Sequence, residues 1–194
     1  MDRSDAELIA AHIAGDEAAF GTLVERHLKA VYSFVVRFVG SEHDAEDITQ
    51  ETFLKAWKSA SNYRAEASAF KTWVLRIARN TAIDHLRKKK HIPLSAFENS
   101  EGHNVLAETV SDERELPDET MARMQDVQAL TAALEHLHPN AREVLLLHYT
   151  NGLTFLEIGE MLGEKQNTIK SRHHRAVLQL RALLEGTTEG PSSV

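Results

Sequence analysis

The sequence predicts an all-α protein of two small helical domains joined by a flexible acidic linker. Apolar residues recur three and four positions apart through most of residues 4–90 and 121–185, which is the period of an amphipathic helix. Residues 92–120 instead carry eight acidic residues and one arginine, without a sustained period. This segment accounts for the whole formal net charge of −7 of the 194-residue chain, so the two flanking blocks are together neutral.

The composition excludes several classes of protein. The absence of cysteine rules out disulfides, cysteine-ligated zinc and thiol redox chemistry within this chain. No run of eighteen apolar residues is present, and the acidic start is unlike a signal peptide, so we expect a cytoplasmic protein without membrane insertion. We expect neither enzymatic activity nor a cofactor, because there is no glycine-rich phosphate loop, nucleophile elbow or plausible catalytic carboxylate pair. The best histidine cluster, His136, His138 and His148, spreads over different helix faces, so no metal site is expected.

Three helices are predicted before residue 61. Ser4 and Glu7 form a capping box for the first, which ends at Gly15. Asp16 caps the second, which ends at Gly40. The third begins at Ser41 and places Asp44, Asp47 and Glu51 on one outward face beside Gln50. Such a face is commonly just solvated, but it is also able to dock a basic partner helix.

A strongly basic helix is predicted over residues 68–90. It carries seven lysines and arginines against a single aspartate and ends in four consecutive cations. Next to its apolar face runs a mixed polar stripe that includes Trp73, Arg76, Asn80, Asp84 and Arg87. Cations with an amide and an aromatic ring suit phosphates and unpaired bases, although a solvated basic face over an ordinary core explains the stripe equally well.

The short polar connection before this helix contains Tyr63 and Arg64. An aromatic ring and a guanidinium beside a basic helix could hold a splayed base, and the alternative is an aromatic packed within the loop. After the helix, the acidic linker of about 30 residues can extend to roughly 100 Å, which exceeds the ~70 Å of two duplex turns. The two blocks could therefore engage separate DNA sites.

The second block is predicted to contain a helix-turn-helix. One helix ends before Pro139, the next runs to Asn151-Gly152, and Thr154 with Glu157 forms a capping box for a short helix. The spacing of Gly159, Gly163 and Ile169 then matches a close helix crossing, a turn and a core plug. The final helix, residues 167–184, would place its N-terminal side chains in a major groove. A helical hairpin of another module is the alternative. The candidate base readers are Lys165, Gln166, Asn167, Lys170, Ser171 and His174, and the candidate phosphate contacts are Arg172 and Arg175.

Three stretches resemble the signatures of bacterial sigma factors of the sigma-70 family, in the extracytoplasmic-function (ECF) group. They are DAEDITQETFLKAW, FKTWVLRIARNTAIDHLRKKK and LEIGEMLGEKQNTIKSRHHRA. The resemblance implies a sigma-2 domain at residues 1–91, a linker at 92–120, a sigma-4 domain at 121–185 and a disordered tail at 186–194. It also implies three partners: core RNA polymerase, through its β′ clamp helices and β subunit, promoter DNA, and an anti-sigma factor.

The resemblance assigns roles to residues of all three stretches. Polymerase binding is implied for Asp44, Asp47, Gln50, Glu51, Phe53 and Trp57. Recognition and opening of the −10 element is implied for Tyr63, Arg64, Trp73, Arg76, Asn80, Asp84, Arg87 and Lys88. Recognition of the −35 element is implied for Lys165, Gln166, Asn167, Thr168, Lys170, Ser171, Arg172, His174 and Arg175.

The chain departs from the common pattern at the reading helix. Gly159, Glu164, Asn167 and His173 stand where the family usually has alanine, an apolar residue, glycine and leucine. The −35 sequence that is read therefore does not transfer from the family, and His173 is expected at the edge of the core. The loop between Arg64 and Phe70 is also one residue longer than usual.

The function expected is that of a dissociable promoter-specificity subunit. It would bind core polymerase, read the −35 and −10 elements and assist promoter melting. One alternative is a stand-alone helix-turn-helix regulator that uses only the second block. Another is a sigma-like decoy that binds a partner but no promoter.

Overall fold

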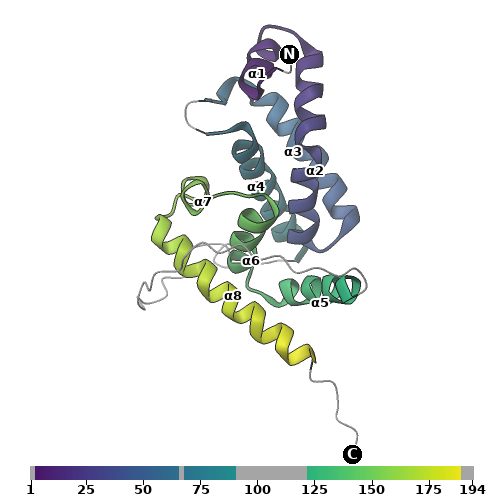
Figure 1. The fold of residues 1–194 in the computed structure, drawn as a ribbon. Helices are drawn as coiled ribbons and strands as arrows, with labels where there is room; N and C mark the ends of the chain where they lie inside the picture. Colours follow the sequence, from purple (N-terminus) through teal and green to yellow (C-terminus); the bar gives the residue numbers. More distant parts are fainter. Residues whose placement is uncertain (1–2, 66–67, 91–121, 189–194) are drawn as a thin grey trace, which may run out of the picture.

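The computed structural model describes residues 3–65, 68–90 and 122–188, and the elements in these ranges are all helical. The predicted linker at residues 92–120 lies outside the described residues. Figure 1 shows a first block, residues 3–90, in purple to teal, and a second block, residues 122–188, in green to yellow. The elements are α1 (Asp5–Ile13), α2 (Glu17–Val39), α3 (Glu42–Lys58), η1 (Ala60–Asn62), α4 (Phe70–Lys90), α5 (Ala122–His136), α6 (Pro139–Leu145), η3 (Leu146–Thr150), α7 (Phe155–Leu162) and α8 (Gln166–Thr188).

The first block is a bundle of α2, α3 and α4, with α1 packed against α2 at one end (Figure 1). Its apolar stripes meet at Phe34 of α2, Ile48 of α3 and Leu75 of α4, all fully buried. The capping box at α1 is confirmed, since the Glu7 amide donates to Ser4 Oγ and the Ser4 amide donates to the Glu7 carboxylate. These local signals fix where the helices begin and so fix the register of the bundle.

The ends of α2 follow the expectation in part. Asp16 is the N-cap residue, but its side chain makes no capping hydrogen bond and pairs with Arg3 Nη1 at 3.1 Å. Gly40 ends the helix in the left-handed region, with φ of 74°. The chain can then turn back at once into α3, which the Ser41 hydroxyl caps.

The helix expected between Pro139 and Asn151-Gly152 is divided in two. The α-helix α6 ends at Leu145, and residues 146–150 form a π-helical turn, η3. The Asn151 amide accordingly reaches five residues back to Leu146 O at 3.3 Å. Beyond this turn α7 begins as predicted, after a capping box of Thr154 and Glu157. The final helix α8 runs to Thr188, three residues into the segment assigned to a tail.

The two blocks share one continuous core. α2 packs against α6 and η3, and α4 packs against α7 (Figure 1). Leu147 and Ile158 of the second block belong to the same buried cluster as Phe34 and Leu75 of the first. Two polar contacts to main-chain oxygens also cross the boundary, from Arg142 Nη1 to Phe38 O at 3.0 Å and from Lys71 Nζ to Asn151 O at 2.5 Å. The blocks are therefore docked and not merely tethered.

Candidate polymerase and nucleic-acid interfaces

The polar stripe of α4 remains on the surface. Arg76, Asn80, Asp84 and Arg87 are all exposed, at positions three or four apart along the helix. Arg87 Nη1 lies 3.5 Å from Asp84 Oδ1, a loose pair between two exposed side chains. Such a pair contributes little to stability, so both groups can exchange it for a ligand at small cost. The stripe, with the exposed Lys88 beside it, can face a nucleic-acid strand in this conformation.

Two aromatic rings predicted to contact DNA lie in the core instead. Tyr63 and Trp73 are each 8% exposed and surround the buried Phe70, with ring centroids 5.4–5.7 Å apart. The Tyr63 hydroxyl donates to Ser68 O at 3.0 Å, which folds the loop back over the start of α4. Arg64 stays exposed and donates to Ser61 O and Tyr63 O. The structure thus shows the packed-loop arrangement, and stacking of either ring on a base requires this aromatic cluster to open.

The outward face of α3 is smaller than expected. Asp47, Gln50, Glu51 and Trp57 are exposed, but Asp44 and Phe53 are each only 7% exposed. The exposed face also includes Leu54, which is 51% exposed and is not among the residues predicted to bind polymerase. An apolar residue four positions after Gln50 on an otherwise polar stripe was the available signal. Acidic, amide and apolar groups here form a surface suited to a partner that is both basic and apolar.

Asp44 turns inward because α4 ends beside it. Lys89 Nζ donates to both carboxylate oxygens of Asp44 at 2.7 and 2.8 Å, and His85 Nε2 lies 3.2 Å away. The hydrogen bond from Lys89 is the main reason that the pKa of Asp44 is lowered to about 2, against the cost of burial. This carboxylate therefore ties the start of α3 to the basic end of α4.

We expect Asp44→Asn to lower the free energy of unfolding by about 1–3 kcal/mol, because Lys89 loses a charged acceptor. The stabilisation from the ionised carboxylate is present above pH 3.8, the pKa of an unperturbed aspartate, and is lost as the pH falls through about 2. Urea unfolding at pH 7 measures the change. Asp47→Asn, an exposed position on the same helix, is the matched control and should stay within 0.5 kcal/mol, roughly the range of surface substitutions. Equal losses for both variants would contradict the assignment.

The helix-turn-helix has a tight crossing that explains one unusual residue. A Cβ atom at Gly159 would lie 2.8 Å from Glu164 O, closer than Cβ atoms in proteins approach another non-bonded atom. The Glu164 amide also donates to Gly159 O at 2.8 Å, so α7 and the turn are in direct contact there. Gly163 takes the left-handed conformation, with φ of 71°, and Ile169 is fully buried between the helices. The three positions therefore do what their spacing predicted.

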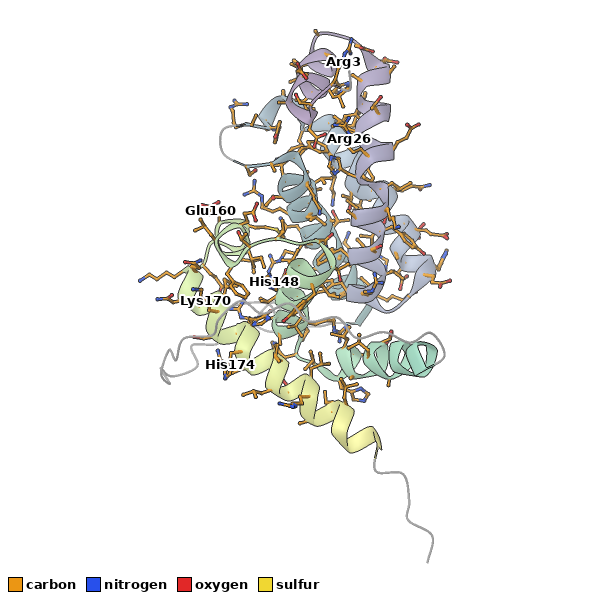
Figure 2. All side chains as sticks on the ribbon, in the orientation of Figure 1. Arg3, Arg26, His148, Glu160, Lys170 and His174 are labelled. Atoms are coloured by element: carbon orange, nitrogen blue, oxygen red, sulfur yellow. The ribbon has the colours of Figure 1, made fainter. Side chains whose placement is uncertain are left out.

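The face of α8 that is predicted to read the −35 element is open to solvent. Figure 2 shows Lys170 and His174 on the outer side of this helix. Arg172 differs, because its Nη2 lies 2.6 Å from Glu164 Oε2 and both side chains are nearly buried. It serves the fold of the turn in this conformation, which the phosphate-contact prediction did not foresee. The exposed candidates are Lys165, Gln166, Asn167, Thr168, Lys170, Ser171, His174 and Arg175.

A cluster of rings surrounds His173 of α8. His173 of α8 contacts His148, Tyr149 and Phe155, with centroids 4.9–5.5 Å apart, and its Nε2 lies 3.0 Å from the Tyr149 hydroxyl. Burial, followed by the neighbouring His148 and His174, lowers the pKa of His173 to about 4. The ring is therefore neutral near pH 7, as suits a residue expected at the edge of the core.

Residues 3–65, 68–90 and 122–188 contain neither a membrane span nor a metal site. No helix in these ranges is both long and apolar enough to cross a bilayer, and no group of three or more histidine, aspartate or glutamate residues there is placed to hold a metal ion.

Comparison with known proteins accounts for both blocks. Residues 23–92 match the family model described as sigma-70 region 2, and residues 127–180 match the one described as sigma-70, region 4. The ECF RNA polymerase sigma factor SigE of Mycolicibacterium smegmatis is 37% identical over 173 residues, 88% of this chain; the chain spans only 64% of the length of that relative. SigW of Bacillus subtilis, also an ECF RNA polymerase sigma factor, is 32% identical over 172 residues, 88% of this chain and 91% of the relative.

Two solved structures share the arrangement. The structure of CnrH in complex with the cytosolic domain of CnrY aligns with a TM-score of 0.68 and 26% identity, over 95% of this chain and 99% of that one. The sigma factor RpoE of Bartonella quintana, in complex with the anti-sigma factor NepR, aligns with a TM-score of 0.64 and 27% identity, over 86% and 96%. With both family models matched and with ECF factors among its relatives, the chain belongs to the sigma-70 family of RNA polymerase sigma factors, in the ECF group.

Proposed function

We propose that this chain is a promoter-specificity subunit that joins core RNA polymerase, recognises −35 and −10 promoter elements and assists strand opening. The observation that carries the proposal is the presence, in one sigma-family chain, of two separate exposed polar surfaces: the polar stripe of α4 and the outer face of α8. The catalytic chemistry of RNA synthesis belongs to the polymerase, so we assign no enzymatic activity and place the chain with the polymerase in the cytoplasm.

We assign the roles as follows. The exposed face of α3 docks on the β′ clamp helices of core polymerase, with Leu54 and Trp57 as its apolar anchors. The first block, residues 1–91, reads the −10 element through Arg64 and the α4 stripe, and Tyr63 and Trp73 join only if their cluster opens. The second block, residues 121–185, contacts the β subunit and reads the −35 element through α8. An anti-sigma factor is a further partner, which the structure of the similar RpoE with NepR supports.

Run-off transcription with core polymerase and a cognate promoter tests this proposal. Asn80→Ala and Lys170→Ala should each lower the run-off yield about tenfold, the loss typical for one specific contact to a base or phosphate. Arg175→Ala, at an exposed candidate phosphate contact, should reduce the salt dependence of promoter binding by about one unit of slope. Gln179→Ala, exposed farther along α8, is the control and should retain the full yield.

The same experiment distinguishes the alternatives. A stand-alone regulator would bind duplex DNA tightly without polymerase and would not need residues 1–90. A decoy would bind its partner but tolerate both the Asn80 and the Lys170 substitution. Failure of the purified protein to form a complex with core polymerase would overturn the proposed function.

A further inference from the structure

A buried ion pair joins the two blocks. Glu143 of α6 is 1% exposed, and both its carboxylate oxygens accept hydrogen bonds from the guanidinium of Arg79 in α4. The second of these contacts, from Arg79 Nη2 to Glu143 Oε2, measures 3.4 Å. Neither residue belongs to the proposed polymerase or DNA contacts. The pair is thus available for a role in how the blocks are held together.

A second ion pair affects the pKa of Glu143. Arg172 and Glu164, 2.6 Å apart in the helix-turn-helix, are close enough to influence the carboxylate of Glu143. Burial raises the pKa of Glu143, while Arg79 and Arg172 oppose that rise. Glu143 therefore depends on cations from both blocks to remain ionised in its buried position. Arg172 belongs to the same block as Glu143, whereas Arg79 belongs to the first block.

The docked arrangement is too short to reach two promoter elements at the same time. A compact chain of 194 residues has a radius of gyration of about 16 Å, and so a diameter of roughly 40 Å. Elements that lie two duplex turns apart are ~70 Å from each other. Hence α4 and α8 can engage both only after the second block leaves α2 and α4.

We infer that Arg79 and Glu143 form a latch that holds the protein in a closed state, and that the latch must open before both promoter elements can be contacted. The link to promoters rests on the proposed function, whereas the latch itself does not. A buried ion pair suits a reversible contact, because the Coulombic attraction is largely offset by the loss of hydration and both ions recover water on opening.

This physics predicts opposite results for single and double substitutions. Arg79→Ala leaves Glu143 buried without its principal cation, so opening, which hydrates the carboxylate, becomes favourable. The double variant Arg79→Met with Glu143→Leu removes both charges and fills the space with apolar groups, so the closed state should persist. A contact that merely adds stability would be weakened by both changes.

Single-molecule energy transfer on the full chain provides the measurement. Because the chain has no cysteine, dyes can be attached at Lys29→Cys on α2 and Gln179→Cys on α8, both exposed positions. The parent should populate mainly the high-efficiency closed state. Arg79→Ala should raise the open-to-closed ratio at least tenfold, and the double apolar variant should match the parent. Arg37→Ala, which removes an exposed arginine bonded to Ser33 O within α2, should change nothing.

Several outcomes would overturn the latch. One is an energy-transfer histogram of Arg79→Ala that is identical to that of the parent. Another is an equal rise in the open-to-closed ratio for Arg37→Ala, and the third is opening of the double apolar variant. Glu143→Gln gives an independent check, since it leaves Arg79 without a carboxylate and should also open the protein. Circular dichroism of each variant establishes that the helices remain folded.

Binding to core polymerase separates this inference from the proposed function. If only the open state binds, the apparent Kd of Arg79→Ala should be lower than that of the parent by the factor by which the open fraction rises. An unchanged Kd despite clear opening would show that the latch does not gate polymerase binding. Absence of binding by every variant, the parent included, would count against the proposed function and leave the energy-transfer result intact.

Discussion

Replacing Ile169 with alanine is expected to lower the free energy of unfolding by about 2–5 kcal/mol, the usual cost of truncating a buried aliphatic side chain. Ile169 is fully buried at the crossing of α7 and α8, where Gly159 lets the turn come within direct contact. Such close packing leaves little room for neighbours to fill the space. Chemical denaturation followed by circular dichroism measures the loss.

The same substitution should weaken recognition of the −35 element more than recognition of the −10 element. Ile169 fixes the angle of α8 against α7, and therefore the position of Lys170 and the other reading side chains. Leu178→Ala is the matched control, because Leu178 lies on the same helix but is 53% exposed. If the two variants lose the same stability, Ile169 is not the core plug that its burial indicates.

Acidification should destabilise the second block between pH 6.5 and pH 4. His173 has a pKa of about 4 when folded and 6.5 as an unperturbed group, so the unfolded chain binds more protons in this range. The contribution of neutral His173 to the free energy of unfolding is thus fully present above pH 6.5 and decreases as the pH falls towards 4. For a ring that is only half buried, we expect a loss of about 2 kcal/mol.

His173→Leu tests the origin of this acid sensitivity. Leucine suits the apolar surroundings of Phe155 and cannot bind a proton, so the variant should unfold with a much flatter dependence on pH in this range. His43→Gln, an exposed position on α3, should keep the slope of the parent. Urea denaturation at pH 7 and pH 5 compares the three proteins, and an unchanged slope in His173→Leu would assign the effect to other groups.

The local features of the fold were predictable from the sequence because they depend on neighbours along the chain. Capping boxes at Ser4 and Thr154 and left-handed glycines at positions 40 and 163 need only a few residues each, and all four are present. The helix-turn-helix was predictable for the same reason, through the spacing of Gly159, Gly163 and Ile169. The exposed stripe of α4 followed from helical periodicity alone.

The features that were missed depend on where helices end and on residues far apart in the chain. Asp44 has the helical position of an outward residue, but the end of α4 brings Lys89 to it across 45 positions. Trp73 has the helical position of a residue on the polar stripe, yet the loop carrying Tyr63 folds over it. The pair of Arg79 and Glu143 spans 64 positions, and no periodicity relates two residues on different blocks.

The contact between Arg142 and Phe38 has a consequence for how the free protein can be observed. A carbonyl in the last turn of a helix has no partner within the helix, and for Phe38 that partner is a guanidinium from the second block. Undocking would return this oxygen to water and allow the end of α2 to fray. The amide protons of that turn should then exchange with deuterium faster whenever the blocks separate. Their exchange rate would therefore measure how often the blocks separate in a protein that carries no dye.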